Sequence, residues 1–337
     1  MATRIGNNTI EFNLKPSVLS YASVVGKKES EGPFGKAFDV VSKDALFGED
    51  SFEKAESKLQ KTAVEVALKK SGITKDDVDA IFAGDLLNQC IGSSFGLKSF
   101  DIPFVGMYGA CSTMALTLIM SSLLIDSGAA KKAIAVTSSH FCSAERQYRF
   151  PLEYGSQRPQ TAQWTVTGSG AVILTSNSQK AYIDKATIGI MQDLGVKDAN
   201  NMGAAMAPAA ADTIKRFFDD TQTKPNDYDV IFTGDLGLVG SNLLYDLLNR
   251  ENIDIKSKHR DCGLLIFDRK KQDVHAGGSG CGCSASILAA YILKELESGN
   301  LKNILFCATG ALLSPTSTQQ GGSIPSIAHL VNIKSRA

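Results

Sequence analysis

The sequence predicts a layered α/β fold built from two related halves. An octet at residues 79–86 (DAIFAGDL) recurs at 229–236 as DVIFTGDL, with six of the eight positions identical. A second, weaker echo relates residues 127–131 (SGAAK) to 298–302 (SGNLK), and each copy precedes an apolar, strand-like run. Solenoid repeats recur about every 20–50 residues. These two octets begin 150 residues apart, which indicates one duplicated unit.

After an irregular start at residues 1–50, the first half is expected to alternate helices and strands. The expected segments are a helix at 51–71, a strand at 80–83, a helix at 113–126 and a strand at 133–137. Gly72 is placed to end the first helix, and Gly128 the second. Near-continuous apolar runs such as 80–83 are typical of strands buried on both faces of a parallel sheet.

The second half repeats this order. The expected segments are a helix at 209–218, a strand at 230–233, a helix at 243–248, a strand at 264–267, a helix after the Gly-rich turn 277–282 that runs to 296, and a strand at 304–308. A chain of 337 residues exceeds the roughly 250–300 at which one core stops growing. We therefore expect two halves, 1–178 and 179–337, in an α/β arrangement with mostly parallel sheets.

Composition and charge exclude several classes of protein. Lysine plus arginine and aspartate plus glutamate each number 35, so no general basic field attracts nucleic acid. The seven cysteines follow no regular framework, which indicates free thiols in a reducing compartment. The first 14 residues have no apolar core of a signal peptide, and the longest apolar stretch, 114–125, is far shorter than the roughly 20 residues that span a bilayer. We expect a soluble or at most peripheral protein.

Residues 141–167 fit neither a helical nor a strand period. The segment is rich in arginine, glutamine and aromatic residues. Long irregular insertions in compact domains are usually lids or binding loops. We therefore expect a lid-like insertion within the first half.

Cys111 is the first candidate for chemistry. It lies in the turn 109–112 (GACS), directly before the expected helix at 113–126. A thiol at a helix N-terminus faces unpaired backbone N–H groups and the positive end of the helix dipole, which lowers its pKa and favours the thiolate. The alternative is a small buried residue that lets the turn pack, because free cysteine is among the most buried residue types.

These features resemble the thiolase and ketoacyl-synthase superfamily over nearly the whole chain. In that superfamily a nucleophilic cysteine opens the buried helix of the first half, where Cys111 stands here. Residues 168–172 (GSGAV) resemble its Gly-Asp-Gly-Ala segment, and 308–312 (ATGAL), which include Gly310, resemble its Gly-rich C-terminal loop. The resemblance implies a thiolase-like fold, with two pseudo-symmetric halves and mixed sheets in a layered α/β arrangement.

The chain departs from that superfamily where catalytic partners are expected. It reads Thr-Gly-Asp-Leu at 233–236, where relatives often carry a histidine, and Gly-Cys-Gly-Cys at 280–283, where they carry Gly-Asn or Gly-His. Acyl transfer needs such groups to activate the nucleophile and build an oxyanion hole. Their loss argues against Claisen-type catalysis, so no residue is assigned a catalytic role.

Two further constellations remain open. His140 follows the strand at 133–137, at the edge where ligands gather in α/β sheets, and lies there either beside Cys111 or as a capped loop residue. Cys281 and Cys283, with His275 nearby, lack the C-x₂₋₄-C spacing of structural zinc sites. Small residues that pack the start of a helix are the preferred interpretation of that pair.

The insertion narrows the resemblance to one family. Residues 143–151 (SAERQYRFP), 161–168 (TAQWTVTG) and 108–112 (YGACS) are similar to the stage V sporulation protein AD family of spore-forming bacteria. That resemblance implies a protein that binds dipicolinic acid or its calcium chelate and acts with membrane proteins of the same operon. It implies a role in dipicolinate uptake into the developing spore and release at germination. It implies a protein that is soluble or peripherally associated with the spore inner membrane, and no cofactor beyond calcium in the ligand. The superfamily resemblance implies a homodimer that pairs through an edge strand of the first half.

Dipicolinate is a small planar dianion with an aromatic ring, so its site should offer N–H donors, an arginine fork and an aromatic wall. The N–H donors are expected at Cys111 and Ser112, the fork at Arg146 or Arg149, and a further donor at His140. The wall is expected from Tyr148, Phe150 or Trp164. The full set of expected ligand-binding residues is Cys111, Ser112, His140, Arg146, Tyr148, Arg149, Cys281 and Gly310.

Three alternatives stay open. Each arginine has the alternative of a surface or inter-subunit salt bridge. An acyltransferase that uses Cys111 as nucleophile with His140 is the alternative function. A purely structural subunit of a membrane complex, with an empty pocket, is the third hypothesis.

Overall fold

The same five-stranded sheet is built twice along the chain. The computed structural model describes residues 1–149 and 158–336. The strands of the first sheet are β3 (Ser17–Val25), β5 (Ala80–Gly84), β6 (Phe104–Gly106), β7 (Lys132–Ser139) and β9 (Gly168–Thr175). Those of the second are β10 (Ala181–Thr187), β11 (Val230–Thr233), β12 (His259–Asp261), β14 (Asn303–Ala311) and β15 (Ser326–Ser335). The strand orders, β6-β5-β7-β9-β3 and β12-β11-β14-β15-β10, correspond one to one.

The strand directions correspond as well. In each sheet the first three strands run parallel, and the last two pairings are antiparallel. The two sheets meet at one pairing, between Ser17 of β3 and Tyr182 of β10. The expectation of mostly parallel sheets is therefore wrong, whereas the mixed sheets implied by the superfamily resemblance are confirmed.

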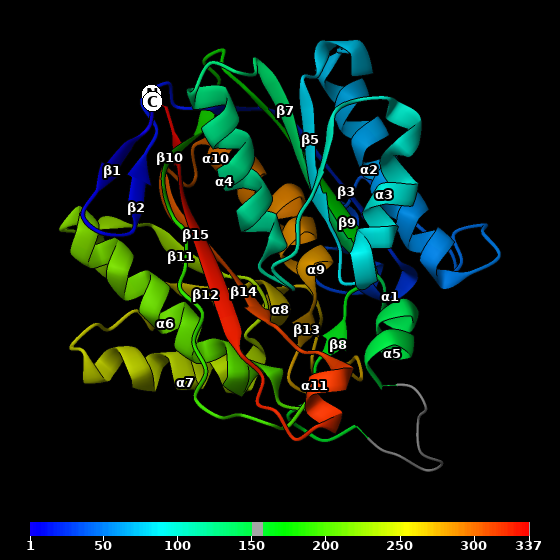
Figure 1. Ribbon diagram of the computed structural model, residues 1–337, viewed down its shortest axis with the longest axis vertical. Coiled ribbons are helices and arrows are strands. Elements are labelled where there is room, and N and C mark those ends of the chain that lie inside the picture. The colour runs from blue at the N-terminus through cyan, green and yellow to red at the C-terminus, as the bar shows by residue number, and fades with distance from the viewer. Residues whose placement is uncertain (150–157, 337) are drawn as a thin grey trace.

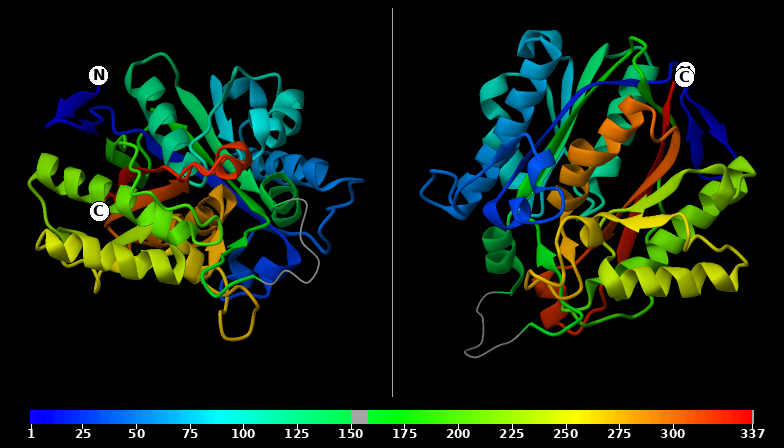
Figure 2. Two further views of the ribbon diagram at one scale, coloured as in Figure 1. Left: turned by 60° about the horizontal axis from the view of Figure 1, so that its bottom comes forward. Right: turned by 180° about the vertical axis from the view of Figure 1, so that it is seen from behind.

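Helices cover and separate the two sheets in five layers (Figures 1 and 2). Helices α2 (Phe52–Ser71) and α3 (Ile91–Leu97) pack on the outer face of the first sheet, and α6 (Met202–Thr221) and α7 (Gly237–Arg250) on that of the second. Between the sheets lie α4 (Thr113–Asp126) and α9 (Cys281–Ile287). The chain continues from α9 through a π-helical turn (Leu288–Ile292) into α10 (Leu293–Ser298).

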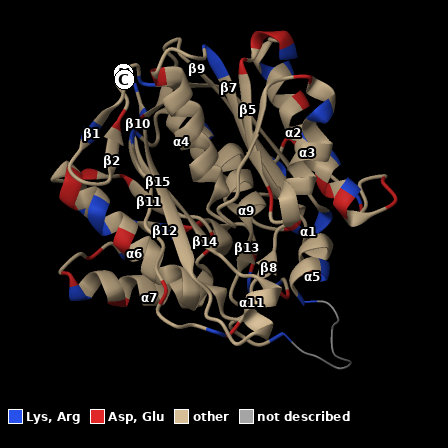
Figure 3. Ribbon diagram, viewed as in Figure 1, with Lys and Arg blue, Asp and Glu red and all other residues tan. Residues whose placement is uncertain are grey.

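The buried middle layer explains the composition of its helices. Figure 3 shows that charged residues are concentrated on the outer elements and that α4 and α9 are almost free of them. A helix that is apolar on all sides must be buried on all sides. Both helices satisfy this condition because each contacts strands or helices on either side.

In each half, the octet is hydrogen-bonded to the end of the second repeated segment. The carboxylate of Asp79, which opens the first octet, accepts from the backbone N–H groups of Lys131 and Lys132 at 2.7 and 2.9 Å. Asp229, which opens the second octet, accepts from those of Lys302 and Asn303 at the same two distances. Each octet thus fixes the point where the second echo ends and the neighbouring parallel strand, β7 or β14, begins.

Local signals at the helix ends agree with the structure where they are strong. The Ser51 side chain accepts from the Lys54 N–H at the start of α2, and Gly72 ends that helix with φ of 69°. Helix α4 has the bounds that the sequence predicts, and β11 does as well. Helices α6 and α7 are longer than expected, and α6 continues through Pro208, directly before its predicted start at 209.

Three expectations about elements are wrong. Residues 1–50 are not irregular, because they contain the nine-residue central strand β3. The strand expected at 264–267 is β12 at 259–261, followed by a short helix, α8 (Cys262–Leu265). This error arises because a short apolar run suits a helix as well as a strand. The insertion begins with a helix, α5 (Phe141–Arg149), and later forms the short strand β8 (Trp164–Thr165).

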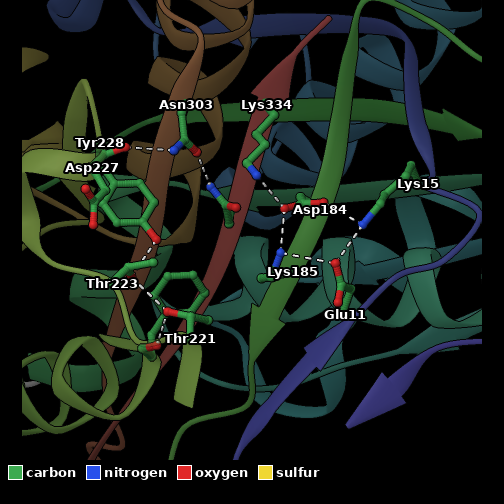
Figure 4. Close-up of polar contacts among 12 residues, drawn as sticks. Glu11, Lys15, Asp184, Lys185, Thr221, Thr223, Asp227, Tyr228, Asn303 and Lys334 are labelled. Carbon is green, nitrogen blue, oxygen red and sulfur yellow. Dashed lines mark hydrogen bonds and ion pairs between the residues drawn. The ribbon is translucent and has the colours of Figure 1, made fainter. Parts of the chain in front are cut away.

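The N-terminal segment is held on the second half by charges (Figure 4). Strands β1 (Thr3–Ile5) and β2 (Thr9–Glu11) form a hairpin, and β2 pairs with β10. Asp184 of β10 contacts Lys15 at 2.6 Å, Lys334 at 2.8 Å and Lys185 at 2.9 Å. Burial alone would raise the pKa of Asp184, but its hydrogen bonds to the three lysines outweigh burial and lower it. In residues 1–149 and 158–336, no helix is long and apolar enough to cross a membrane.

Candidate ligand pocket

A pocket lies between the two halves, where the N-terminus of α4 meets the insertion. It encloses about 420 Å³ of empty space, part of it open to solvent. Its lining from the first half comprises Leu86, Ala110, Cys111, Ala144, Glu145, Tyr148, Arg149 and Thr165. Its lining from the second half comprises Met202, Ser279, Ala311 and Leu313. A largely apolar pocket with a few convergent polar groups is the usual form of a small-molecule site.

Cys111 lies at the floor of this pocket. It follows Ala110, whose backbone is left-handed with φ of 49°, and its side chain is buried. Its Sγ lies 3.9 Å from the Oγ of Ser279, which comes from β13 (Gly278–Ser279) of the second half. A left-handed non-glycine residue costs free energy and persists where the surrounding structure over-determines it. The expected position of Cys111 at the helix start is therefore found, with a neighbour from the second half.

Asp235, the second aspartate of the second octet, lies behind the pocket floor and accepts hydrogen bonds from the residues that form it. One of its carboxylate oxygens accepts from Ser279 Oγ at 3.0 Å and from the Gly280 N–H at 2.8 Å. The other accepts from Thr309 Oγ1 at 2.8 Å. The carboxyl group is completely buried, and burial raises its pKa. Asp235 thus serves as a buried hydrogen-bond acceptor behind the pocket floor.

The expectation of a Cys111 thiolate is wrong. Burial raises the pKa of the Cys111 thiol well above its ordinary value, and the nearby Asp235 carboxylate raises it further. The helix N-terminus does not compensate, because the N–H groups of Ser112 and Thr113 donate to the carbonyls of Gly109 and Ala110. The side chain at the pocket floor is a neutral thiol, which can donate a weak hydrogen bond.

The insertion supplies one wall and holds the second half in place. Thr165 of β8 pairs with Ser279 of β13 in a parallel two-stranded sheet. Before it, the Gln163 side chain donates to the carbonyls of Asp235 at 2.7 Å and Gly278 at 2.8 Å. The insertion of the first half therefore fixes the segments of the second half that reach Cys111.

Helix α5 of the insertion presents an arginine and a tyrosine to the pocket. The Tyr148 hydroxyl donates to the carbonyl of Leu86, and it lies 3.3 Å from the hydroxyl of Tyr108 at the rim. Burial raises the pKa of Tyr148, so the phenol is neutral. The Arg149 guanidinium lies 3.4 Å from the carboxylate of Glu145, one turn earlier on the same helix. Arg149 is the only cationic residue in the described lining.

His140 does not meet Cys111. Its Nε2–H donates to the carbonyl of Ala45 at 2.7 Å, and its Nδ1 accepts from the Cys142 N–H at 3.1 Å. Burial lowers the pKa of His140. It lines a different cavity, under α1 (Lys27–Ser30). The expectation that His140 lies beside Cys111 is therefore wrong, and the alternative of a capped loop residue holds.

Four other expected residues lie outside the pocket lining. The Arg146 side chain is 58% exposed and pairs with Glu53 at 3.0 Å, so the salt-bridge alternative holds for it. The Ser112 hydroxyl donates to the carbonyl of Gly109 at 2.6 Å. The Cys281 thiol donates to the carbonyl of Ser138 at 2.9 Å. A side chain on Gly310 would meet the Gly109 carbonyl oxygen at 2.4 Å, so this glycine lets β14 approach the Cys111 turn.

The aromatic wall is also narrower than expected. Trp164 stacks on Phe141, with ring centroids 3.7 Å apart, and both line the cavity that holds His140. Phe150 lies outside the described residues. Of the expected aromatic residues, Tyr148 lines the pocket. Among the described residues, no group of three or more histidine, cysteine or acidic side chains is arranged to hold a metal ion.

Sequence reasoning missed the residues that shape the pocket from the second half. Asp235, Ser279 and Thr309 were not expected as site residues. The one available signal was the octet itself, because its second aspartate recurs as Asp85. Asp85 is likewise buried and accepts from the N–H of Ser93 at 2.7 Å and that of Leu87 at 2.9 Å.

The fold is that of the thiolase-like condensing enzymes. The 3-oxoacyl-[acyl-carrier-protein] synthase III of Aquifex aeolicus superposes with a TM-score of 0.59 at 12% identity, over 95% of this chain and 99% of that one. The cerulenin-bound OleA of Xanthomonas campestris superposes with a TM-score of 0.61 at 12% identity, over 95% of this chain and 96% of that one. At such low identity these likenesses establish the fold alone.

The sequence places the chain more narrowly within that fold. Residues 6–334 match the sequence model of the family described as stage V sporulation protein AD. The protein of that name from Bacillus subtilis (strain 168) is 48% identical over 324 residues, which cover 96% of each chain. The chain belongs to the stage V sporulation protein AD family.

Proposed function

We propose that this protein binds dipicolinic acid, alone or as its calcium chelate, in a thiolase-type pocket that no longer catalyses acyl transfer. Membership of the family supports a role in sporulation. In this proposal the protein acts with membrane proteins of the same operon, at the spore inner membrane. It takes part in moving dipicolinate into the developing spore and out again at germination.

The observation that carries the proposal is the position of Arg149. Its guanidinium lies in a pocket beside the neutral phenol of Tyr148 and the neutral thiol of Cys111. A guanidinium presents a planar fork that suits a carboxylate, and an aromatic neighbour suits a flat ring. One charged donor beside apolar and aromatic surface favours a small aromatic carboxylate.

The chemistry of the floor supports binding over acyl transfer. A cysteine nucleophile reacts as the thiolate and needs a base or a lowered pKa. Burial and Asp235 instead raise the pKa of Cys111, and the described lining contains no histidine. Asp235 also has its carboxylate oxygens engaged by Ser279, Gly280 and Thr309. These contacts favour a floor that holds a ligand over one that attacks it.

Replacing Arg149 with methionine is expected to weaken dipicolinate binding about 100-fold, because a hydrogen-bonded charge pair in a pocket contributes about 1.5–3 kcal/mol. Isothermal titration calorimetry, with and without calcium, measures the effect. Arg146→Met is the matched control, since Arg146 lies on the same helix but outside the pocket. Equal losses in both variants, or none in either, would place the ligand elsewhere on the protein.

The exposed edge of the first sheet supports a homodimer. Strand β6 lies at the end of the sheet order, and Phe104 and Val105 on it are 41% and 45% exposed. Tyr108, directly after it, is 47% exposed. An apolar edge strand is a ready template for pairing with another chain. We propose that β6 pairs antiparallel with the β6 of a second copy, which would continue the sheet and cover these side chains.

Val105→Lys is expected to convert the dimer to a monomer without unfolding it, because the charge would be buried only in the dimer. Sedimentation velocity at micromolar concentration measures the oligomeric state. Leu238→Lys is the control, since Leu238 is also exposed, by 40%, but lies on α7 of the second half. A Val105→Lys protein that remains dimeric, or a monomeric wild type, would rule out this interface.

A further inference from the structure

The pocket contains an acid that a site for an anionic ligand does not require. Glu145 lies one helical turn before Arg149 on α5, and their charged groups are 3.4 Å apart. The two side chains are only 16% and 17% exposed, and both line the pocket. By contrast, Lys54 in the first turn of α2 and Asp50, which precedes that helix, form an i,i+4 pair whose side chains are 62% and 75% exposed. The Glu145–Arg149 pair is therefore part of the site and not of the outer helix face.

The other charged groups around Glu145 are already engaged. Arg158 pairs with Asp273 at 2.6 Å and lies over the Trp164 ring at 4.9 Å. Asp235 lies behind Ser279 with its oxygens hydrogen-bonded. Within the described lining, one cation thus faces one acid. The positive charge of Arg149 is balanced from within the protein before any ligand arrives.

The Arg149 side chain can change its partner without a change in the backbone. It is long and flexible, and its one ion pair among the described residues is to Glu145 on its own helix.

We propose that Glu145 is an internal substitute for the carboxylate of the ligand and sets how much negative charge the pocket admits. An entering carboxylate takes Arg149 from Glu145 and then lies beside the Glu145 carboxylate. Like charges a few ångströms apart repel, and more strongly in a partly dry pocket than in water. The pocket therefore disfavours a free dicarboxylate relative to a ligand with one carboxylate or with a compensating positive charge. This inference rests on the proposed function in its choice of ligand class.

The test compares wild type with Glu145→Gln, which keeps the shape and removes the charge. Calorimetric titration is expected to show dipicolinate bound about tenfold more tightly by Glu145→Gln, with a smaller gain for picolinate, which has one carboxylate. Glu53→Gln is the matched control, because Glu53 holds Arg146 on the outer side of α5, and it should leave both affinities unchanged. Unchanged or weaker dipicolinate binding by Glu145→Gln would overturn the inference.

A second measurement does not depend on the ligand. Phenylglyoxal modifies accessible guanidinium groups, and peptide mass spectrometry locates the modified arginine. Arg149 is expected to react several-fold faster in Glu145→Gln than in wild type, and equally fast in Glu53→Gln and wild type. Equal rates in Glu145→Gln and wild type overturn the inference whatever the titrations show. Absence of binding in every protein, combined with faster modification, would reject dipicolinate as the ligand while supporting the role of Glu145.

Discussion

Replacing Asp235 with alanine is expected to lower the free energy of unfolding by about 3–5 kcal/mol, because it leaves three buried donors without an acceptor, at a cost of about 1–3 kcal/mol each. The donors left without an acceptor are Ser279 Oγ, the Gly280 N–H and Thr309 Oγ1. Since Ser279 contacts Cys111, the floor of the pocket should also lose its shape. Urea unfolding followed by circular dichroism measures the stability, and titration of the folded variant with dipicolinate measures the pocket.

Two controls separate this effect from a loss of charge alone. Asp246→Ala removes an exposed acid from α7 and should change stability by no more than about 0.5 kcal/mol. Asp235→Asn keeps an acceptor oxygen at the same place and should recover part of the loss. If Asp235→Ala were as stable as Asp246→Ala, the hydrogen bonds to the Asp235 carboxylate would not be stabilising the second half behind Cys111.

Stability is expected to fall by about 2–3 kcal/mol between pH 6.5 and 8, because three buried acids keep their protons in the folded protein to a higher pH than in the unfolded chain. Burial raises the pKa of Glu29 and of Asp261 to about 7, and that of Glu56 to about 8. Above the ordinary pKa of a carboxyl group, about 4, the folded protein therefore binds more protons than the unfolded chain. The stabilising effect of this protonation is fully present below that pH and is lost as the pH rises through 7 and 8.

Two buried histidines act in the opposite sense. Burial lowers the pKa of His259 and of His329 to about 4. Between about pH 6.5 and 4 the unfolded chain binds protons that these folded histidines do not, so their contribution is lost as the pH falls. As the pH falls, the two histidines therefore cancel part of the stability that protonation of the three acids adds. The stability curve is therefore expected to be flatter below about pH 5.5 than near pH 7.

Glu56→Gln isolates the largest contribution to the decline. Glu56 accepts from Ser143 Oγ at 2.7 Å and Ser138 Oγ at 3.2 Å, and an amide can replace it without a charge. The variant should lose about 1.5–2 kcal/mol of the decline between pH 6.5 and 8. Glu65→Gln, at an exposed position of the same helix, should follow the wild-type curve. Urea midpoints measured across that range decide the matter, and parallel curves for all three proteins would contradict the expectation.

The sequence was most informative where it repeats. The octets predict β5 and β11, and their opening aspartates make equivalent hydrogen bonds to the following strands. A repeated local pattern can be interpreted without knowing the distant contacts, because each copy forms the same strand and the same aspartate hydrogen bonds. The helix at Cys111 was placed correctly for the same reason: its apolar run and flanking turn are local signals.

The sequence was least informative about which arginine enters the pocket. Arg146 and Arg149 are three residues apart in a segment that showed no period. The rotation of α5 decides that Arg149 faces Glu145 and the pocket, while Arg146 reaches Glu53 on α2. The predicted position of His140 was wrong for a related reason. Its hydrogen-bond partner, the Ala45 carbonyl, is 95 residues away along the chain. Residues that lie near one another in sequence predict a shared region but not a shared direction.

By itself, the amino-acid sequence determined the duplicated α/β fold, the family, and the place of Cys111 at the start of a buried helix. These follow from local patterns, the most informative of which is written twice along the chain. Only the tertiary structure decided what surrounds Cys111. It brings Asp235 and Ser279 from the second half against a thiol of the first, and it buries them together. Burial outweighs the helix N-terminus and raises the pKa of the thiol, and no local pattern in the sequence reports the burial of a side chain by a segment far away along the chain.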